Sequence, residues 1–127
     1  MSNILSDVVS ICGSISLPCE VGVYHATPAP IAYAVLVPID VNTLCADDRP
    51  QQEVQSLRIM LYTKGSYTAK LKQLKNQIVD AGLCISDSRH IEYEPDSGYH
   101  SYAVDVEKNY EWDYVIQEEQ TNGTHRS

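Results

Sequence analysis

Hydrophobic residues recur at helical spacing near the start of the chain. The residues that carry this spacing, at intervals of four, three and four positions, are Ile4, Val8, Ile11 and Ile15. Such intervals place side chains on one side of a helix, which Ser2 or Asn3 can cap. Pro18 excludes a continuing helix. We therefore expect an amphipathic helix over residues 3–16.

The next part of the chain changes from helical to strand patterns. Residues 20–24 predict a short strand, and the two prolines within 27–30 predict an extended connector. Residues 31–39 are apolar at both parities, which is typical of a strand covered on both faces and predicts a central position. From Asp40 to Gln55 the pattern becomes polar. This stretch predicts either a projecting loop or an extended hairpin arm.

An alternating strand and an amphipathic helix follow. Residues 57–62 are aliphatic at every second position, which predicts a strand with its aliphatic side toward a helix. A helix is expected over residues 67–81, with Ser66 as its N-cap and Gly82 as the left-handed residue after its end. Its lysines indicate a solvated face rather than a nucleic-acid contact. Its apolar side consists of Leu71, Leu74, Ile78 and Ala81.

The last patterned segment predicts a β-hairpin. A four-residue turn at 95–98 would place Tyr93 opposite His100 and Ile91 opposite Tyr102. On the returning strand, the valines and most aromatic residues share one parity. The other parity carries the acids Asp105, Glu107, Glu111 and Asp113. We therefore expect one long edge of the sheet to be acidic.

These elements together predict an α+β fold. We expect an antiparallel-rich mixed sheet of four to five strands, with two helices packed mainly on one face. The single domain would span residues 1–116. Residues 117–127 are polar and almost free of apolar side chains, which predicts a disordered tail.

Charge and composition narrow the classes of function. The chain has 17 acidic and nine basic residues and a net charge of −8, which argues against a scaffold that grips nucleic acid. Nine tyrosines with no phenylalanine suit half-buried strand faces and protein interfaces, because tyrosine combines apolar area with a polar tip. No apolar run approaches the roughly 20 residues that span a bilayer. We expect no membrane contact.

Motifs for catalysis are missing from the sequence. It contains no G-x-S-x-G elbow, no P-loop and no dinucleotide glycine fingerprint. The hairpin register above points His90 to one side of the sheet and His100 to the other, so no metal site is expected. We predict a protein that is not an enzyme and has no cofactor.

The cysteines show no pairing motif and follow no signal peptide. They are Cys12, Cys19, Cys45 and Cys84. Without a C-x-x-C pair they are expected to be small buried or half-buried hydrophobes in a reduced, cytoplasmic setting.

Four segments between residues 18 and 114 follow one another in a distinctive order and spacing. They are Ala46-Asp47-Asp48, the strand end Leu61-Tyr62-Thr63-Lys64, the lysine-rich helix that closes at Gly82, and the hairpin return from Tyr102 to Glu107. In this order and spacing, residues 18–114 resemble the tail terminators of long-tailed bacteriophages (siphophages), which are also called tail completion or head-tail joining proteins.

The resemblance implies a homohexameric ring that caps the tail tube, stops its polymerisation and joins the tail to the head. The partners would be the tail-tube protein and a head-completion or neck protein, with DNA passing through the lumen without specific binding. The protein would be assembled in the host cytoplasm and located in the virion tail. The contact residues implied are Asp47, Asp48 and Arg49 on an arm, and Arg58 and Tyr62 on the strand near a neighbouring subunit.

Three other functions fit the same patterns. A head-completion (stopper) protein or a tail-tube subunit could share the design. A cytoplasmic ferredoxin-like domain would bind a small molecule in a concave apolar pocket between helix and sheet. A small enzyme would use Cys84 or Cys45, one of which would then be far more reactive than the other thiols.

Overall fold

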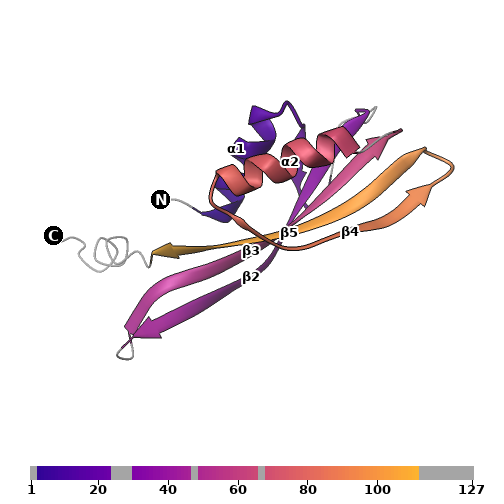
Figure 1. The fold of residues 1–127 in the computed structure, drawn as a ribbon. Coiled ribbons are helices and arrows are strands. Elements are labelled where there is room, and N and C mark those ends of the chain that lie inside the picture. Colours follow the sequence, from indigo (N-terminus) through magenta and orange to yellow (C-terminus); the bar gives the residue numbers. More distant parts are fainter. Residues whose placement is uncertain (1–2, 24–29, 47–48, 66–67, 112–127) are drawn as a thin grey trace, which may run out of the picture.

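The computed structural model describes residues 3–23, 30–46, 49–65 and 68–111, which form two helices and a five-stranded sheet (Figure 1). The predicted α+β class is confirmed. In chain order the elements are α1 (Ile4–Ser14), β1 (Cys19–Val21), β2 (Ala32–Ala46), β3 (Arg49–Lys64), α2 (Thr68–Asp80), β4 (Cys84–Glu94) and β5 (Tyr99–Glu111).

The five strands lie in the order β1-β2-β3-β5-β4. Only β1 and β2 are parallel, and the other neighbours are antiparallel. The central strand is therefore β3, and the prediction that residues 31–39 form the central strand is wrong. Strand β1 lies on the outer side of β2 and pairs only with Ala34–Leu36. Val37, the next residue of β2, is 39% exposed. The apolar residues on both sides of this strand therefore belong to a strand that is next to the central one.

Both helices lie together over one face of the sheet (Figure 1). The predicted aliphatic side of β3 faces them: Leu57, Ile59 and Leu61 are fully buried. The core between the layers is completed by residues from α1, α2, β2 and β5, among them Val8, Ile11, Cys12, Leu36, Leu74, Ile78, Val104 and Val106. The amphipathic patterns of the two helices thus predicted the buried face correctly except at Ala81, which is exposed and follows the end of α2.

Local backbone chemistry sets the ends of the helices. The side chain of Asn3 accepts a hydrogen bond from the Ser6 backbone N–H at 2.8 Å, which caps α1 as predicted. Gly82 follows α2 with φ +85°, and its N–H donates to the Val79 carbonyl at 3.0 Å. The Leu83 N–H donates to the Ile78 carbonyl at 3.1 Å. This pair of bonds is a Schellman motif, which needs a left-handed residue and so favours glycine.

The β4–β5 hairpin differs from the predicted register. Tyr93 lies opposite His100 as predicted, but His90 lies opposite Tyr102, because Ile91 is an extra residue in a β-bulge. An extra residue switches the side to which all preceding side chains of the strand point. His90 and His100 therefore lie on the same face of the sheet, and the prediction of opposite faces is wrong.

The expected acidic edge is not formed by the returning strand. The edge strand is β4, because β5 lies between β3 and β4. Asp105 of β5 is paired with Arg58 of β3. The alternation of acids along β5 shows which face these side chains occupy but contains no information on the position of the strand in the sheet.

Tyr110 ties β5 to α1. Its hydroxyl donates to Asp7 Oδ2 at 2.6 Å, and the residue is only 8% exposed. Burial, and then the Asp7 carboxylate, raise the pKa of Tyr110 above its ordinary value. The folded chain therefore holds this proton more tightly than the unfolded chain does. The resulting stabilisation is present below pH ~10 and is lost as pH rises further.

We expect Tyr110→Phe to lower the free energy of unfolding by about 1–2 kcal/mol at pH 7, because a hydrogen bond to a charged group is lost. The difference in the free energy of unfolding between the variant and the natural protein should shrink above pH ~10. Only the natural protein has the Tyr110 hydroxyl, so only its stability falls as this group begins to lose its proton in the unfolded chain. Urea unfolding at pH 7 and pH 11 measures both values. An equal difference at the two pH values would contradict the link between Tyr110 and Asp7.

Candidate assembly surfaces

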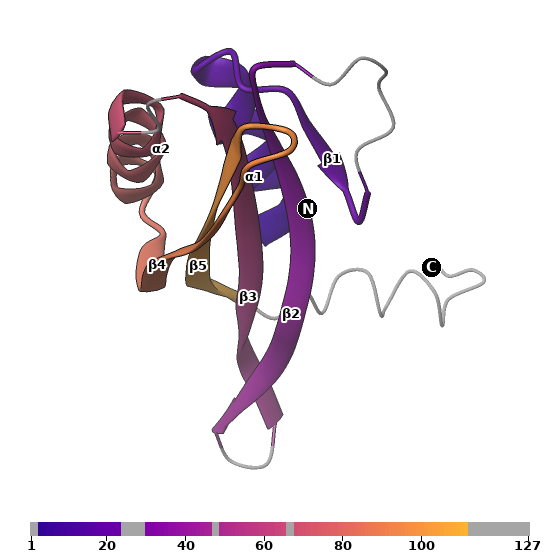
Figure 2. The ribbon, with the colours of Figure 1, turned by 90° about the vertical axis from the view of Figure 1, so that its right-hand side faces the viewer.

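A long hairpin formed by the far halves of β2 and β3 projects from the body of the protein (Figure 2). The two strands stay paired from Asp40 and Ser56 out to Ala46 and Arg49. This hairpin, residues 40–55, is called the arm below. Of the two alternatives that the polar pattern left open, the structure contains the extended hairpin arm.

The described backbone of the arm tip extends beyond the pairing with β5. Pairing between β5 and β3 begins at Gln52, so residues 49–51 have no partner in β5. Arg49 begins β3 at the tip, opposite Ala46, and Asp47 and Asp48 lie outside the described residues. Of the five predicted contact residues, the structure thus places Arg49 at the end of a projection that is remote from the core.

The sheet face that points away from the helices forms a second surface, called the open face below. Its middle is a row of directly paired residues from three strands, Val35, Met60 and Ala103. Val35 and Ala103 do not belong to the core cluster between sheet and helices, although the subunit itself already buries both side chains. Val37, in the next row, is 39% exposed. The apolar part of the open face is therefore only partly accessible, through Met60 and Val37, and accessible apolar area on a sheet face suits a contact between proteins.

Tyr62 lies at one end of the open face. Its ring stacks on that of Tyr33, with 4.9 Å between the ring centroids and 14° between the planes. Tyr99 packs edge-on against Tyr33 at 5.5 Å, and its hydroxyl donates to the Pro30 carbonyl at 2.6 Å. Tyr62 is thus part of an aromatic cluster that is already formed within one subunit.

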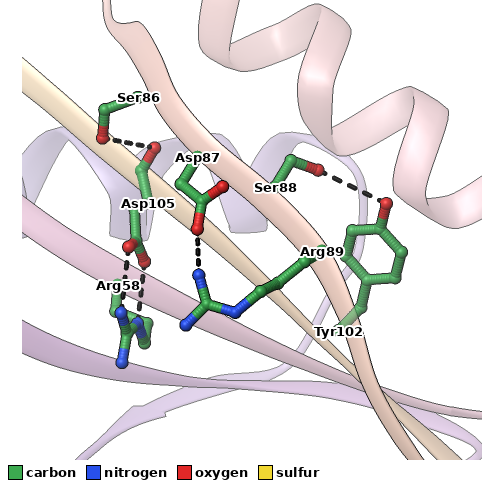
Figure 3. Close-up of polar contacts among 7 residues, drawn as sticks. All are labelled: Arg58, Ser86, Asp87, Ser88, Arg89, Tyr102 and Asp105. Atoms are coloured by element: carbon green, nitrogen blue, oxygen red, sulfur yellow. Dashed lines mark hydrogen bonds and ion pairs between the residues drawn. The ribbon is translucent and has the colours of Figure 1, made fainter.

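Arg58 lies at the other end of the open face. Its guanidinium donates two hydrogen bonds to Asp105, at 2.8 and 3.0 Å (Figure 3). The hydrogen bonds and charge of Asp105, with Asp87 as a smaller contribution, raise the pKa of Arg58. Asp87 also pairs with Arg89 (Figure 3). Two acids and two arginines therefore neutralise one another here, so this end of the open face is polar but not strongly acidic.

Edge strand β4 is less suited to contact with another sheet. Among the described strands its only hydrogen-bonded neighbour is β5. Bulges interrupt it between Ile85 and Asp87 and between His90 and Glu92. Bulges and charged side chains on an edge strand hinder pairing with another chain. The arm and the open face are the better candidates for assembly.

Sequence reasoning missed most of the open face. It singled out Arg58 and Tyr62 but not Tyr33, Val37 or Met60. The available signal was the two-sided apolar pattern of 31–39 together with only two helices, which are expected on one face. One apolar side of that strand then has no helix to cover it.

Within the described residues the thiols differ in their exposure. Cys12 is buried, Cys19 is half-buried and Cys84 is exposed. Burial, and to a smaller extent the neighbouring Cys19 thiol, raise the pKa of Cys12 to about 12. The reactive form of cysteine is the thiolate, and a raised pKa disfavours it.

Two surface hollows lie beside α1. One of about 300 Å³ lies between α1 and α2 and is lined in part by Asp7, Gln77 and Lys108. The other, of about 440 Å³, lies between the start of α1 and the base of the arm and includes Leu5 and Ile39. The second is the more apolar of the two. A ligand-binding function would use this hollow.

In the part of the chain that the structure describes, the helices are too short or too polar to cross a membrane. No group of three or more His, Cys, Asp or Glu side chains in these residues is placed to hold a metal ion.

Comparison with known proteins identifies the fold. No protein-family model and no curated protein matches the chain. A solved structure described as "Virion of native gene transfer agent (GTA) particle" contains a similar chain, with a TM-score of 0.61 and 13% sequence identity. The match covers 86% of this chain and 95% of that chain. At this identity the likeness concerns the fold alone, and the chain therefore shares its α+β architecture with a chain of that virion.

Proposed function

We propose that this chain is a structural subunit of a phage-like particle, namely a tail terminator. In this role it forms a ring on the end of the tail tube, stops the tube from growing and joins the tail to the head. The arm is the observation that carries the proposal. The base of the arm, from Gln52 to Gln55, pairs with β5, but its far part extends past the end of that pairing. A neighbouring subunit is the natural contact for this far part.

A closed ring of identical subunits needs two different surfaces that fit each other. The arm and the open face supply two such surfaces on one small chain. We propose that the arm of each subunit reaches its neighbour, with Asp47, Asp48 and Arg49 near its tip, and that the neighbour's open face, including Arg58 and Tyr62, lies in the contact. Six subunits per ring follow from the resemblance to tail terminators.

Two independent observations point to the same class of protein. The fold is similar to that of a chain in a gene transfer agent virion over 95% of that chain. The net charge of −8 suits a lumen through which DNA passes without binding, because acidic walls repel phosphate groups. The tail-tube protein and a head-completion protein would contact the two sides of the ring.

Particle mass and shape test the proposal. We expect monomers or weak oligomers in dilute solution, and closed rings at high concentration or in the presence of tube ends. Light scattering measures the mass, and electron microscopy shows the shape. Indefinite stacks would favour a tube subunit instead. Monomers under every condition, tubes included, would contradict a ring-forming role.

A further inference from the structure

Two histidines on neighbouring strands bring their ring nitrogens together near the end of the β4–β5 hairpin. His90 Nε2 and His100 Nδ1 are 3.1 Å apart. The ring centroids are 5.4 Å apart, and the ring planes make an angle of 63°. The bulge at Ile91 creates this arrangement, because without the extra residue the two side chains would point to opposite faces.

Aromatic rings pack against both imidazoles. The Tyr93 ring lies 4.6 Å from the His100 ring, and the Tyr102 ring packs edge-on against His90 at 6.3 Å. The hydroxyl of Tyr102 is in turn fixed by Ser88 Oγ at 3.4 Å. His90 is exposed and His100 is half-buried, so a small ion can reach the pair from solvent.

We propose that His90 and His100 form a two-point chelating site for a divalent d-block cation of the Zn²⁺, Ni²⁺ or Cu²⁺ class. Imidazole binds such ions at about 2.0–2.1 Å, so two nitrogens on one ion lie roughly 2.9–3.4 Å apart for bond angles between square and tetrahedral. The observed separation of 3.1 Å falls within this range. A rotation of each ring replaces their mutual hydrogen bond with two bonds to the ion, and water completes the coordination.

The charge of the whole chain favours a cation. The chain carries a net charge of −8, which raises the concentration of cations near its surface. A bound ion would also link β4 to β5 beside their turn and so stabilise this end of the sheet. The site does not depend on the proposed role in assembly, and it uses neither the arm nor the open face.

Calorimetric titration of the full chain with ZnCl₂ at pH 7.5 tests the site, because the ligand nitrogens must be unprotonated. We expect one ion per chain. His90→Gln and His100→Gln should each weaken binding by roughly tenfold or more, since a chelate becomes a single contact. The matched control is the double variant His25→Gln/His125→Gln, which removes the other two histidines and should bind as the natural chain does. Zinc should raise the melting temperature of the natural chain and the control only.

A spectroscopic measurement separates this site from others. With Cu²⁺ as the probe, electron paramagnetic resonance should show two coordinating nitrogens in the natural chain and the control, and one in each single variant. Binding that survives in His100→Gln at the original affinity, or that disappears in the control, would overturn the proposal. So would the absence of any bound ion at millimolar zinc, since the pair would then be a hydrogen bond only.

Discussion

Replacing Leu74 with alanine is expected to lower the free energy of unfolding by about 3 kcal/mol, within the range of ~2–5 kcal/mol for a buried leucine. Leu74 is fully buried and belongs to the cluster that joins α2 to β3 and β5. Removing its three outer carbons leaves a cavity that rigid strands on the other side cannot fill. A domain of this size has about 5–15 kcal/mol of stability in total, so the loss is a large part of it.

Chemical denaturation followed by circular dichroism measures the change, in dilute solution where association does not add stability. The matched control is Val79→Ala on the same helix. Val79 is 62% exposed, so this substitution should change the free energy of unfolding by no more than ~0.5 kcal/mol. Equal losses in the two variants would mean that α2 packs on the sheet with a different face.

The sequence predicted those elements whose signals are local. The amphipathic pattern and Gly82 defined α2, because helical periodicity and a left-handed C-terminal residue are both encoded within a few positions. The alternation of residues 57–62 identified the strand that the helices cover. Each of these signals depends on a side chain being buried or on a backbone angle, and neither requires knowledge of which strands are neighbours.

The predictions that failed depend on neighbours. The position of β2 in the sheet was wrong because a two-sided apolar pattern does not show how far a partner strand extends. The predicted register of the β4–β5 hairpin was wrong for the residues of β4 that precede Ile91, because nothing in the sequence signals the one-residue bulge at that position. That single residue decides whether His90 and His100 lie on one face or on two.

The candidate contact surfaces were predictable in part. The polar stretch from Asp40 to Gln55 indicated a projection, and its hairpin form was one of two alternatives. The open face was predicted only through Arg58 and Tyr62, because its apolar side chains look like core residues until both helices are assigned to the other face. An apolar residue gives the same sequence pattern whether the layer that covers it belongs to its own subunit or to a neighbouring subunit.

Removing the tip of the arm is expected to abolish ring formation and to leave the subunit folded. The deletion replaces residues 45–51 with Asn-Gly, a two-residue turn that suits a tight hairpin. Leu44 and Gln52 are direct partners in the ladder, so the turn joins two positions that already face each other. Every pairing between β3 and β5 is retained, because it begins at Gln52. The deletion removes Asp47, Asp48 and Arg49.

The free energy of unfolding should change by less than ~1 kcal/mol, as expected for a loop tip that lacks core contacts. Assembly should weaken by roughly 100-fold or more, because loss of a central contact costs about 2–4 kcal/mol per interface. Sedimentation at increasing concentration measures the loss. A second variant, with seven Gly and Ser residues in place of 45–51, keeps the length but not the side chains, and it should fail to assemble too. Rings from both variants would exclude the tip as a contact and leave the open face as the surface to test.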